Sequence, residues 1–107
     1  MNDPDSITLA IDIGTSSVRA ALYDGSAKMV PRSLVRIGRT LRNTPDGGAE
    51  IDADEAFAQV VAAIDAVLEK TSRIKIEIDL VTACTFWHSL VGVDKMGKPT
   101  TKVLGWA

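Results

Sequence analysis

The sequence has little of several features that mark whole classes of protein. It has one cysteine, Cys84, which excludes an internal disulfide and fits a reducing compartment such as the cytoplasm. Its longest uninterrupted apolar run, Val60 to Ile64, is far too short to span a bilayer. The first residues are acidic and lack the basic and apolar regions of a signal peptide. The sequence therefore predicts a cytoplasmic protein with no membrane partner.

An excess of charge of one sign is also lacking. The chain has 12 Lys and Arg residues against 14 Asp and Glu, for a net charge of −2 at pH 7, and the two signs are mixed along its length. This balance does not favour a nucleic-acid partner. The 107 residues, 46% of them hydrophobic, suffice for one core and hence for one domain at most.

The chain is organised around a predicted β-hairpin near its start. Two β-rich runs, 7–13 and 18–23, flank a small polar corner. In the first run Ile7, Leu9, Ile11 and Ile13 share one face, because side chains alternate along a strand. Asp12 is therefore expected on the other face, at the end of the strand and beside the corner.

The corner, Gly14 to Ser17, has the residues of a phosphate-binding turn. Gly14 allows the backbone close to a ligand, and the following residues offer hydroxyls and N–H groups. Oriented N–H groups in such a turn form an anion-sized concavity, and a neighbouring carboxylate, Asp12, suits a divalent cation held between it and a phosphate. An ordinary polar hairpin turn fits the same residues, and the local pattern leaves both readings open.

A third strand is expected over 28–37, interrupted early by Pro31, which suggests an edge strand or one that begins after the proline. The segment 38–50 contains proline and glycine and is expected to be an exposed loop. The arginines of this region, interpreted as solvated charges at a sheet edge, are Arg32, Arg36, Arg39 and Arg42.

A helix is predicted from Asp52 to Lys70, with Asp52 as N-cap and Glu55 in capping-box position. One apolar stripe, expected to pack against the sheet, comprises Phe57, Val60, Val61, Ile64, Val67 and Leu68. The mostly apolar run from Ile76 to Cys84 is typical of a strand covered on both faces, with Cys84 as a buried small residue. A strand over 90–93, a turn over 94–97 and a last strand over 102–106 complete the chain.

The predicted order is therefore three strands, a helix, a strand and a closing hairpin. A helix that joins two strands on this scale normally makes a right-handed parallel crossover. This gives an α/β fold with the corner at the edge of the sheet where a ligand is expected to bind.

The run D-I-G-T-S-S, followed by a second strand, resembles the first phosphate motif of the superfamily of actin, heat-shock chaperones and sugar kinases. Within it, the sequence is most similar to the FGGY carbohydrate kinases. The resemblance implies a ribonuclease-H-like, actin-like ATPase fold for this N-terminal subdomain, with ATP and Mg²⁺ as cofactors. Asp12 would then hold Mg²⁺. The residues that would bind the phosphates are Gly14, Thr15, Ser16 and Ser17.

A second stretch, 85–94, followed by Gly97-Lys98-Pro99 and Trp106, resembles the sugar-facing segment of the same kinases. The resemblance implies that Trp87, His88 and Trp106 contact the sugar. Many members have Gln where Phe86 stands, and the Trp-His-Ser run is nearer to gluconokinase-like members. Without the resemblance, a satisfied structural histidine and tryptophans in the core are the favoured interpretation.

The resemblance covers residues 7–106 but only the first part of such a kinase, so the chain is interpreted as a truncated N-terminal piece, inactive alone. The catalytic base is expected beyond Ala107, and no residue of 1–107 is assigned a catalytic role. The implied partners are a sugar or sugar-acid substrate and the remainder of the kinase chain, with a homodimer left open. The alternatives are a non-kinase ATPase or activator of the same superfamily, and a small α/β binding module without nucleotide.

Overall fold

The computed structural model describes residues 3–86 and 88–105. Trp87 and Trp106, two of the expected sugar contacts, lie outside the described residues. Along the described ranges the elements follow in the order β1 (Thr8–Ile13), β2 (Ser17–Tyr23), β3 (Val35–Gly38), β4 (Arg42–Asn43), β5 (Ala49–Ile51), α1 (Ala53–Thr71), β6 (Leu80–Thr85) and β7 (Val103–Gly105).

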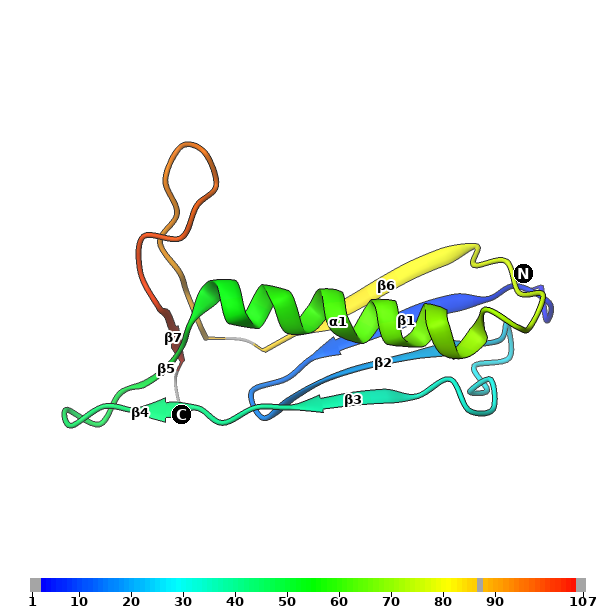
Figure 1. Cartoon of the computed structure of the whole chain (residues 1–107), viewed down its shortest axis with the longest axis horizontal. Coiled ribbons are helices and arrows are strands. Elements are labelled where there is room, and N and C mark those ends of the chain that lie inside the picture. The colour runs from blue at the N-terminus through cyan, green and yellow to red at the C-terminus, as the bar shows by residue number, and fades with distance from the viewer. Residues whose placement is uncertain (1–2, 87, 106–107) are drawn as a thin grey trace.

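Four strands form one sheet in the order β3-β2-β1-β6, which runs along the length of the molecule (Figure 1). β1 and β2 pair antiparallel, with Ile13 opposite Val18, so the predicted hairpin is confirmed. β6 pairs parallel with β1, with Ile13 opposite Thr85, and α1 lies between these strands in the chain. The predicted strand–helix–strand crossover is therefore present.

The core lies between one face of this sheet and α1. Leu9 and Ile11 of β1 are buried on that face, and Ala63 and Val67 of the helix are fully buried against it. The helix begins as predicted, because the side chain of Asp52 accepts the backbone N–H of Glu55 at 3.0 Å. The opposite face of the sheet carries no helix (Figure 1), and Asp12 lies on it, exposed.

The third strand is shorter than expected and begins after the proline. Pro31 is followed by Arg32 with φ of 64°, a left-handed conformation that interrupts an extended chain. The buried Ser33 hydroxyl accepts the Leu22 N–H at 3.0 Å, a bond that a regular ladder would otherwise supply. β3 then runs from Val35 to Gly38 at the edge of the sheet.

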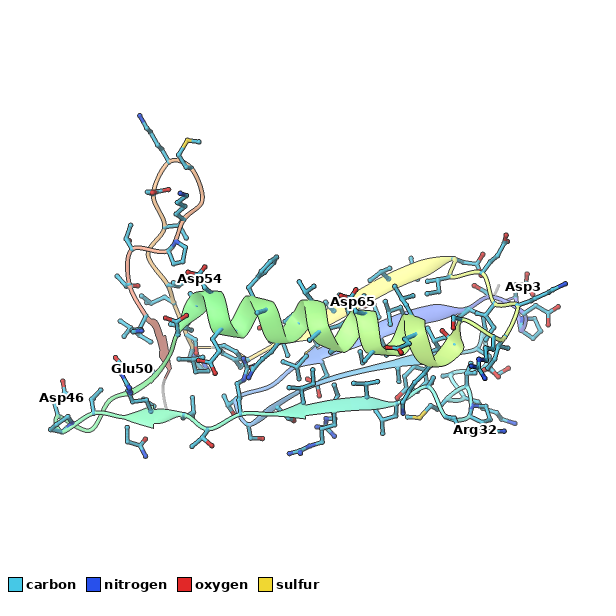
Figure 2. The ribbon with its side chains drawn as sticks, viewed as in Figure 1. Asp3, Arg32, Asp46, Glu50, Asp54 and Asp65 are labelled. Atoms are coloured by element: carbon cyan, nitrogen blue, oxygen red, sulfur yellow. The ribbon has the colours of Figure 1, made fainter. Side chains whose placement is uncertain are left out.

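The expectation that 38–50 forms an exposed loop is wrong for part of the segment. It contains β4 and the first residues of β5, and Ala49 is buried. β5 pairs with β7, with Ala49 opposite Gly105, in a second sheet of order β4-β5-β7. This pairing joins residues far apart in the chain, so the local composition of 38–50 gives no sign of it. Asp46 lies at the tip of the β4–β5 hairpin (Figure 2).

The predicted burial is also wrong for part of the helix stripe and for β6. Phe57 is 71% exposed, and Val61 and Leu68 are exposed as well, since α1 packs on β2 and β3 through the side of the helix that carries Ala63 and Val67. β6 is exposed along its whole length, including Cys84, because the helix does not extend over it. The apolar composition of β6 is that of a covered strand, but the described residues leave both its faces open.

The end of the chain forms a long hairpin with little regular pairing. The expected strand over 90–93 is reduced to two isolated bridges, of Leu90 with Leu104 and of Val93 with Pro99. The predicted turn is confirmed, with the Asp94 carboxylate accepting the N–H groups of Met96 and Lys98 and Gly97 at φ of 79°. The described part of the chain has no helix with the length and apolar character needed to cross a membrane.

Candidate active site: the phosphate corner and its neighbours

The corner between β1 and β2 is a tight turn. The Gly14 N–H donates to the Ser17 carbonyl at 2.9 Å, closing the turn directly beyond the last hairpin pair. A Cβ atom added to Gly14 would lie 3.0 Å from the Ser17 oxygen, closer than such contacts normally are. Any other residue would have to push the Ser17 carbonyl back by a few tenths of an ångström, so glycine favours the close approach of the two ends of the turn.

The corner has polar groups that the described part of the chain does not use. Within residues 3–86 and 88–105, the N–H groups of Thr15 and Ser16 donate to no acceptor, and the hydroxyls of Thr15, Ser16 and Ser17 take part in no hydrogen bond. Thr15 is partly buried and Ser16 is exposed. Donors left unpaired in a tight turn are suited to an anion.

Asp12 lies beside the corner with an accessible carboxylate. Its side chain is 51% exposed, and its Oδ2 atom lies 3.3 Å from Nη2 of Arg19, the residue opposite it on β2. Both residues line a hollow of about 370 Å³ on the sheet face that α1 does not cover. Among the described residues no three acidic, histidine or cysteine side chains group together as metal ligands. One carboxylate fits Mg²⁺ that takes its other ligands from phosphate and water.

The segment after β6 lies next to the corner. The Phe86 N–H donates to the Ile13 carbonyl at 3.0 Å, directly before the corner begins. Thr15, Phe86 and Ser89 line the same small cavity of about 10 Å³, too small for a ligand. The parallel register of β6 and β1 thus brings the two predicted motifs together at one edge of the sheet.

His88 is exposed and has φ of 53°, in the left-handed region. Such a conformation is uncommon for residues with a side chain and occurs preferentially at functional sites. The location of His88 beyond β6 is compatible with a sugar contact, and its role stays a prediction. The predicted roles of Trp87 and Trp106 also stay predictions, since both lie outside the described residues.

Arg39 is the one described residue of this region that the sequence interpretation missed. It is not a solvated edge charge: its backbone N–H donates to the Ser16 carbonyl at 2.8 Å, and its Nη2 donates to the Gly14 carbonyl. Burial lowers the pKa of its guanidinium, while the carboxylate of Glu55 raises it. Its position directly after β3, the strand that pairs with β2 beside the corner, is the only sequence signal for this contact.

The family model and the curated relatives that match this chain all belong to the carbohydrate kinases. Residues 7–107 match the N-terminal domain of the FGGY family of carbohydrate kinases. The gluconokinase of Bacillus subtilis (strain 168) is 30% identical in an alignment that covers 95% of this chain and 19% of that protein.

Solved structures agree on the fold. A gluconate kinase from Lactobacillus acidophilus is 28% identical, with a TM-score of 0.79 over 94% of this chain and 20% of its own. Glycerol kinase of Plasmodium falciparum, crystallised with ADP, is 17% identical with a TM-score of 0.86 over the same shares, and shows likeness of fold alone. The chain spans about a fifth of the length of these relatives. Because the family match covers nearly all of it, the chain belongs to the FGGY family of carbohydrate kinases, as part of the N-terminal domain.

Proposed function

We propose that the protein acts as an ATP-dependent carbohydrate kinase that transfers the γ-phosphate of ATP to a hydroxyl of a sugar, polyol or sugar acid. The observation that carries the proposal is the bond from the Phe86 N–H to the Ile13 carbonyl. It sets the phosphate corner and the segment that contains His88 side by side. Donor and acceptor of a phosphoryl group must meet at one place, because this chemistry depends on positioning and on charge stabilisation.

On the donor side, the corner would receive the phosphates. The unused N–H groups of Thr15 and Ser16 and the hydroxyls of Thr15 to Ser17 support this role. Asp12 would hold Mg²⁺, through water, on the open face of the sheet. The metal would neutralise charge on the phosphates when bound. The residues of this chain would fix where those phosphates lie.

On the acceptor side, His88 would exchange hydrogen bonds with substrate hydroxyls, with Trp87 and Trp106 as apolar surfaces against the sugar. Within the family, relatives named gluconokinase or gluconate kinase match this chain at 26–30% identity. These names favour a sugar acid of the gluconate type over a neutral polyol. The run Trp87-His88-Ser89 supports the same choice.

The remainder of the kinase would supply the catalytic base and the adenosine pocket. Exposed apolar side chains along β6 and α1, among them Val81 and Phe57, support further packing of this kind. A strand as apolar as β6 is normally covered by chain on both faces. Residues 1–107 alone are therefore expected to be inactive.

The test is a phosphorylation assay of the full-length protein with ATP and Mg²⁺ over gluconate, xylulose and glycerol. Turnover is expected with gluconate and is expected to stop on removal of Mg²⁺ by a chelator. Residues 1–107 by themselves serve as the negative control. ATP hydrolysis without transfer to any of the three acceptors would contradict the proposal and favour a non-kinase ATPase of the same fold.

A further inference from the structure

Arg39 makes contacts with three different elements around the corner. Its Nη2 donates to the Gly14 carbonyl, and its Nη1 donates to Oε1 of Gln59 on α1 at 3.3 Å. Its guanidinium carbon lies 5.7 Å from the centre of the Phe86 ring, within the range of a cation–π interaction. One side chain therefore joins the corner, the helix and the residue that precedes the sugar-side segment.

The contacts with the corner involve carbonyl groups. Arg39 binds the Gly14 carbonyl through its side chain and the Ser16 carbonyl through its backbone N–H, while the Ser17 carbonyl accepts the Gly14 N–H. In a planar trans peptide the C=O of one residue and the N–H of the next point in opposite directions. Fixing the Gly14 and Ser16 carbonyls toward Arg39 therefore turns the N–H groups of Thr15 and Ser17 away from it.

The position of the Arg39 guanidinium costs stability at one of its nitrogen atoms. Its Nε is buried and has no partner among the described residues. A buried donor without an acceptor is destabilising, and such groups are rare enough in native proteins to require an explanation. A long, flexible side chain can place its charged end in solvent instead. The other contacts of Arg39 must therefore offset the free energy lost at its unpaired Nε.

We propose that Arg39 is a positioning residue for the phosphate corner: its side chain holds the Gly14 carbonyl so that the Thr15 N–H faces the phosphates of the bound nucleotide. This inference rests on the proposed function. It gives the arginine a specific effect: Arg39 strengthens binding of the phosphate part of ATP and has no part in binding the nucleoside.

Lysine cannot replace arginine in this role. Its single ammonium group has no planar fork to bind the Gly14 carbonyl and Gln59 together while lying over the Phe86 ring. A residue needed only for its positive charge would be replaceable by lysine. Arg39→Lys therefore separates orientation of the corner from simple attraction of an anion.

The experiment compares the dissociation constants of ATP and of adenosine for the full-length protein by titration calorimetry. Wild type is expected to bind ATP more tightly than adenosine. Arg39→Gln and Arg39→Lys are both expected to weaken ATP binding by about 10- to 100-fold, with adenosine affinity unchanged. This is the scale of losing one or two charge-assisted hydrogen bonds from the corner to the phosphates. In steady-state kinetics the KM for ATP should rise while the KM for the sugar stays the same.

The matched control is Arg42→Gln. Arg42 is exposed on β4, close to Arg39 in the sequence, and its substitution removes the same charge. Arg42→Gln is expected to leave the dissociation constant of adenosine divided by that of ATP, called the ratio below, as in wild type. An equal loss in Arg42→Gln and Arg39→Gln would show a general charge effect and overturn the proposal.

The other outcomes are separable. If wild type prefers ATP and both Arg39 variants keep that preference, the positioning role is wrong and the proposed function stands. If wild type shows neither a preference for ATP nor phosphorylation of any acceptor, the proposed function fails and the inference with it. Should the Arg39 variants not fold, Gln59→Ala removes one contact of the guanidinium. It is expected to lower the ratio about threefold to tenfold, and an unchanged ratio would overturn the proposal.

Discussion

Phe86 and Ile13 are joined by a backbone hydrogen bond of 3.0 Å at the point where β6 and β1 both end. The bond continues the parallel register in which Thr85 lies opposite Ile13. Because the strands are parallel, the segments that leave them emerge at the same edge of the sheet. In α/β proteins the carboxyl ends of parallel strands are where ligands bind. One pairing therefore brings together two motifs that are distant in the sequence, as the proposed site requires.

Asp12→Asn tests the carboxylate beside the corner. In the full-length protein we expect kcat to fall by about two orders of magnitude, the scale of losing a preorganised charge contact. Stability should change little, since Asp12 and Arg19 form a half-exposed pair of the kind that contributes little to folding. Asp65→Asn, on the exposed side of α1 (Figure 2), is the matched control. Near-normal turnover of Asp12→Asn at saturating Mg²⁺ would exclude a role for Asp12 in metal binding.

His88→Ala tests the sugar side. We expect kcat/KM for the sugar to fall by about 10- to 100-fold, with ATP affinity unchanged, as for the loss of one or two hydrogen bonds. His88→Gly should show the same kinetic loss and be more stable than the alanine variant by about 1 kcal/mol, because glycine adopts a φ of 53° without strain. Steady-state kinetics and thermal unfolding are both measured for wild type and for each His88 variant. Intact sugar kinetics with a large loss of stability would instead identify a structural histidine.

The sequence is sufficient to predict features that depend on neighbouring residues. Asp52 caps α1 through a bond to a residue one turn along, and the alternation of Leu9, Ile11 and Asp12 assigns the faces of β1. The β–α–β crossover also follows from the order of elements. All three are local or nearly local, so a single sequence contains them.

Burial and long-range pairing were not predictable in the same way. The pairing of Ala49 with Gly105 depends on residues on the far side of α1, and Arg39 gains its contacts only when β3 reaches the corner. The apolar character of Phe57 and β6 indicates that these residues suit a covered position. It does not indicate which part of the chain covers them.

Leu22→Ala and Phe57→Ala test this distinction in the chain of 107 residues. Leu22 is fully buried in β2, so its truncation is expected to lower the free energy of unfolding by about 2–5 kcal/mol. Phe57 is 71% exposed and loses few contacts, so its truncation should cost less than about 1 kcal/mol, as for surface positions. Urea denaturation monitored by circular dichroism measures both. Equal losses would show that Phe57 is packed after all.

The last prediction concerns the start of α1 in acid. The pKa of Asp52 is lowered first by the hydrogen bond from the Glu55 N–H and then by Lys102, whose Nζ lies 2.9 Å from Oδ2. A carboxyl group whose pKa is lower in the folded state stabilises the fold above its unfolded pKa. That contribution is lost as the pH falls through the folded value.

We therefore expect the stability of wild type to decline below about pH 4, the ordinary range of an aspartate, and Asp52→Asn to show a flatter decline. Asparagine still accepts the Glu55 N–H, so the variant keeps the cap and loses the titration together with the ion pair to Lys102. Some acid dependence should persist, because Asp46, whose pKa is lowered by bonds from Thr44 and Gly48, titrates in both proteins. Urea midpoints measured between pH 5 and pH 2 give the comparison. Parallel curves for the two proteins would show that ionised Asp52 adds nothing to the stability of the fold.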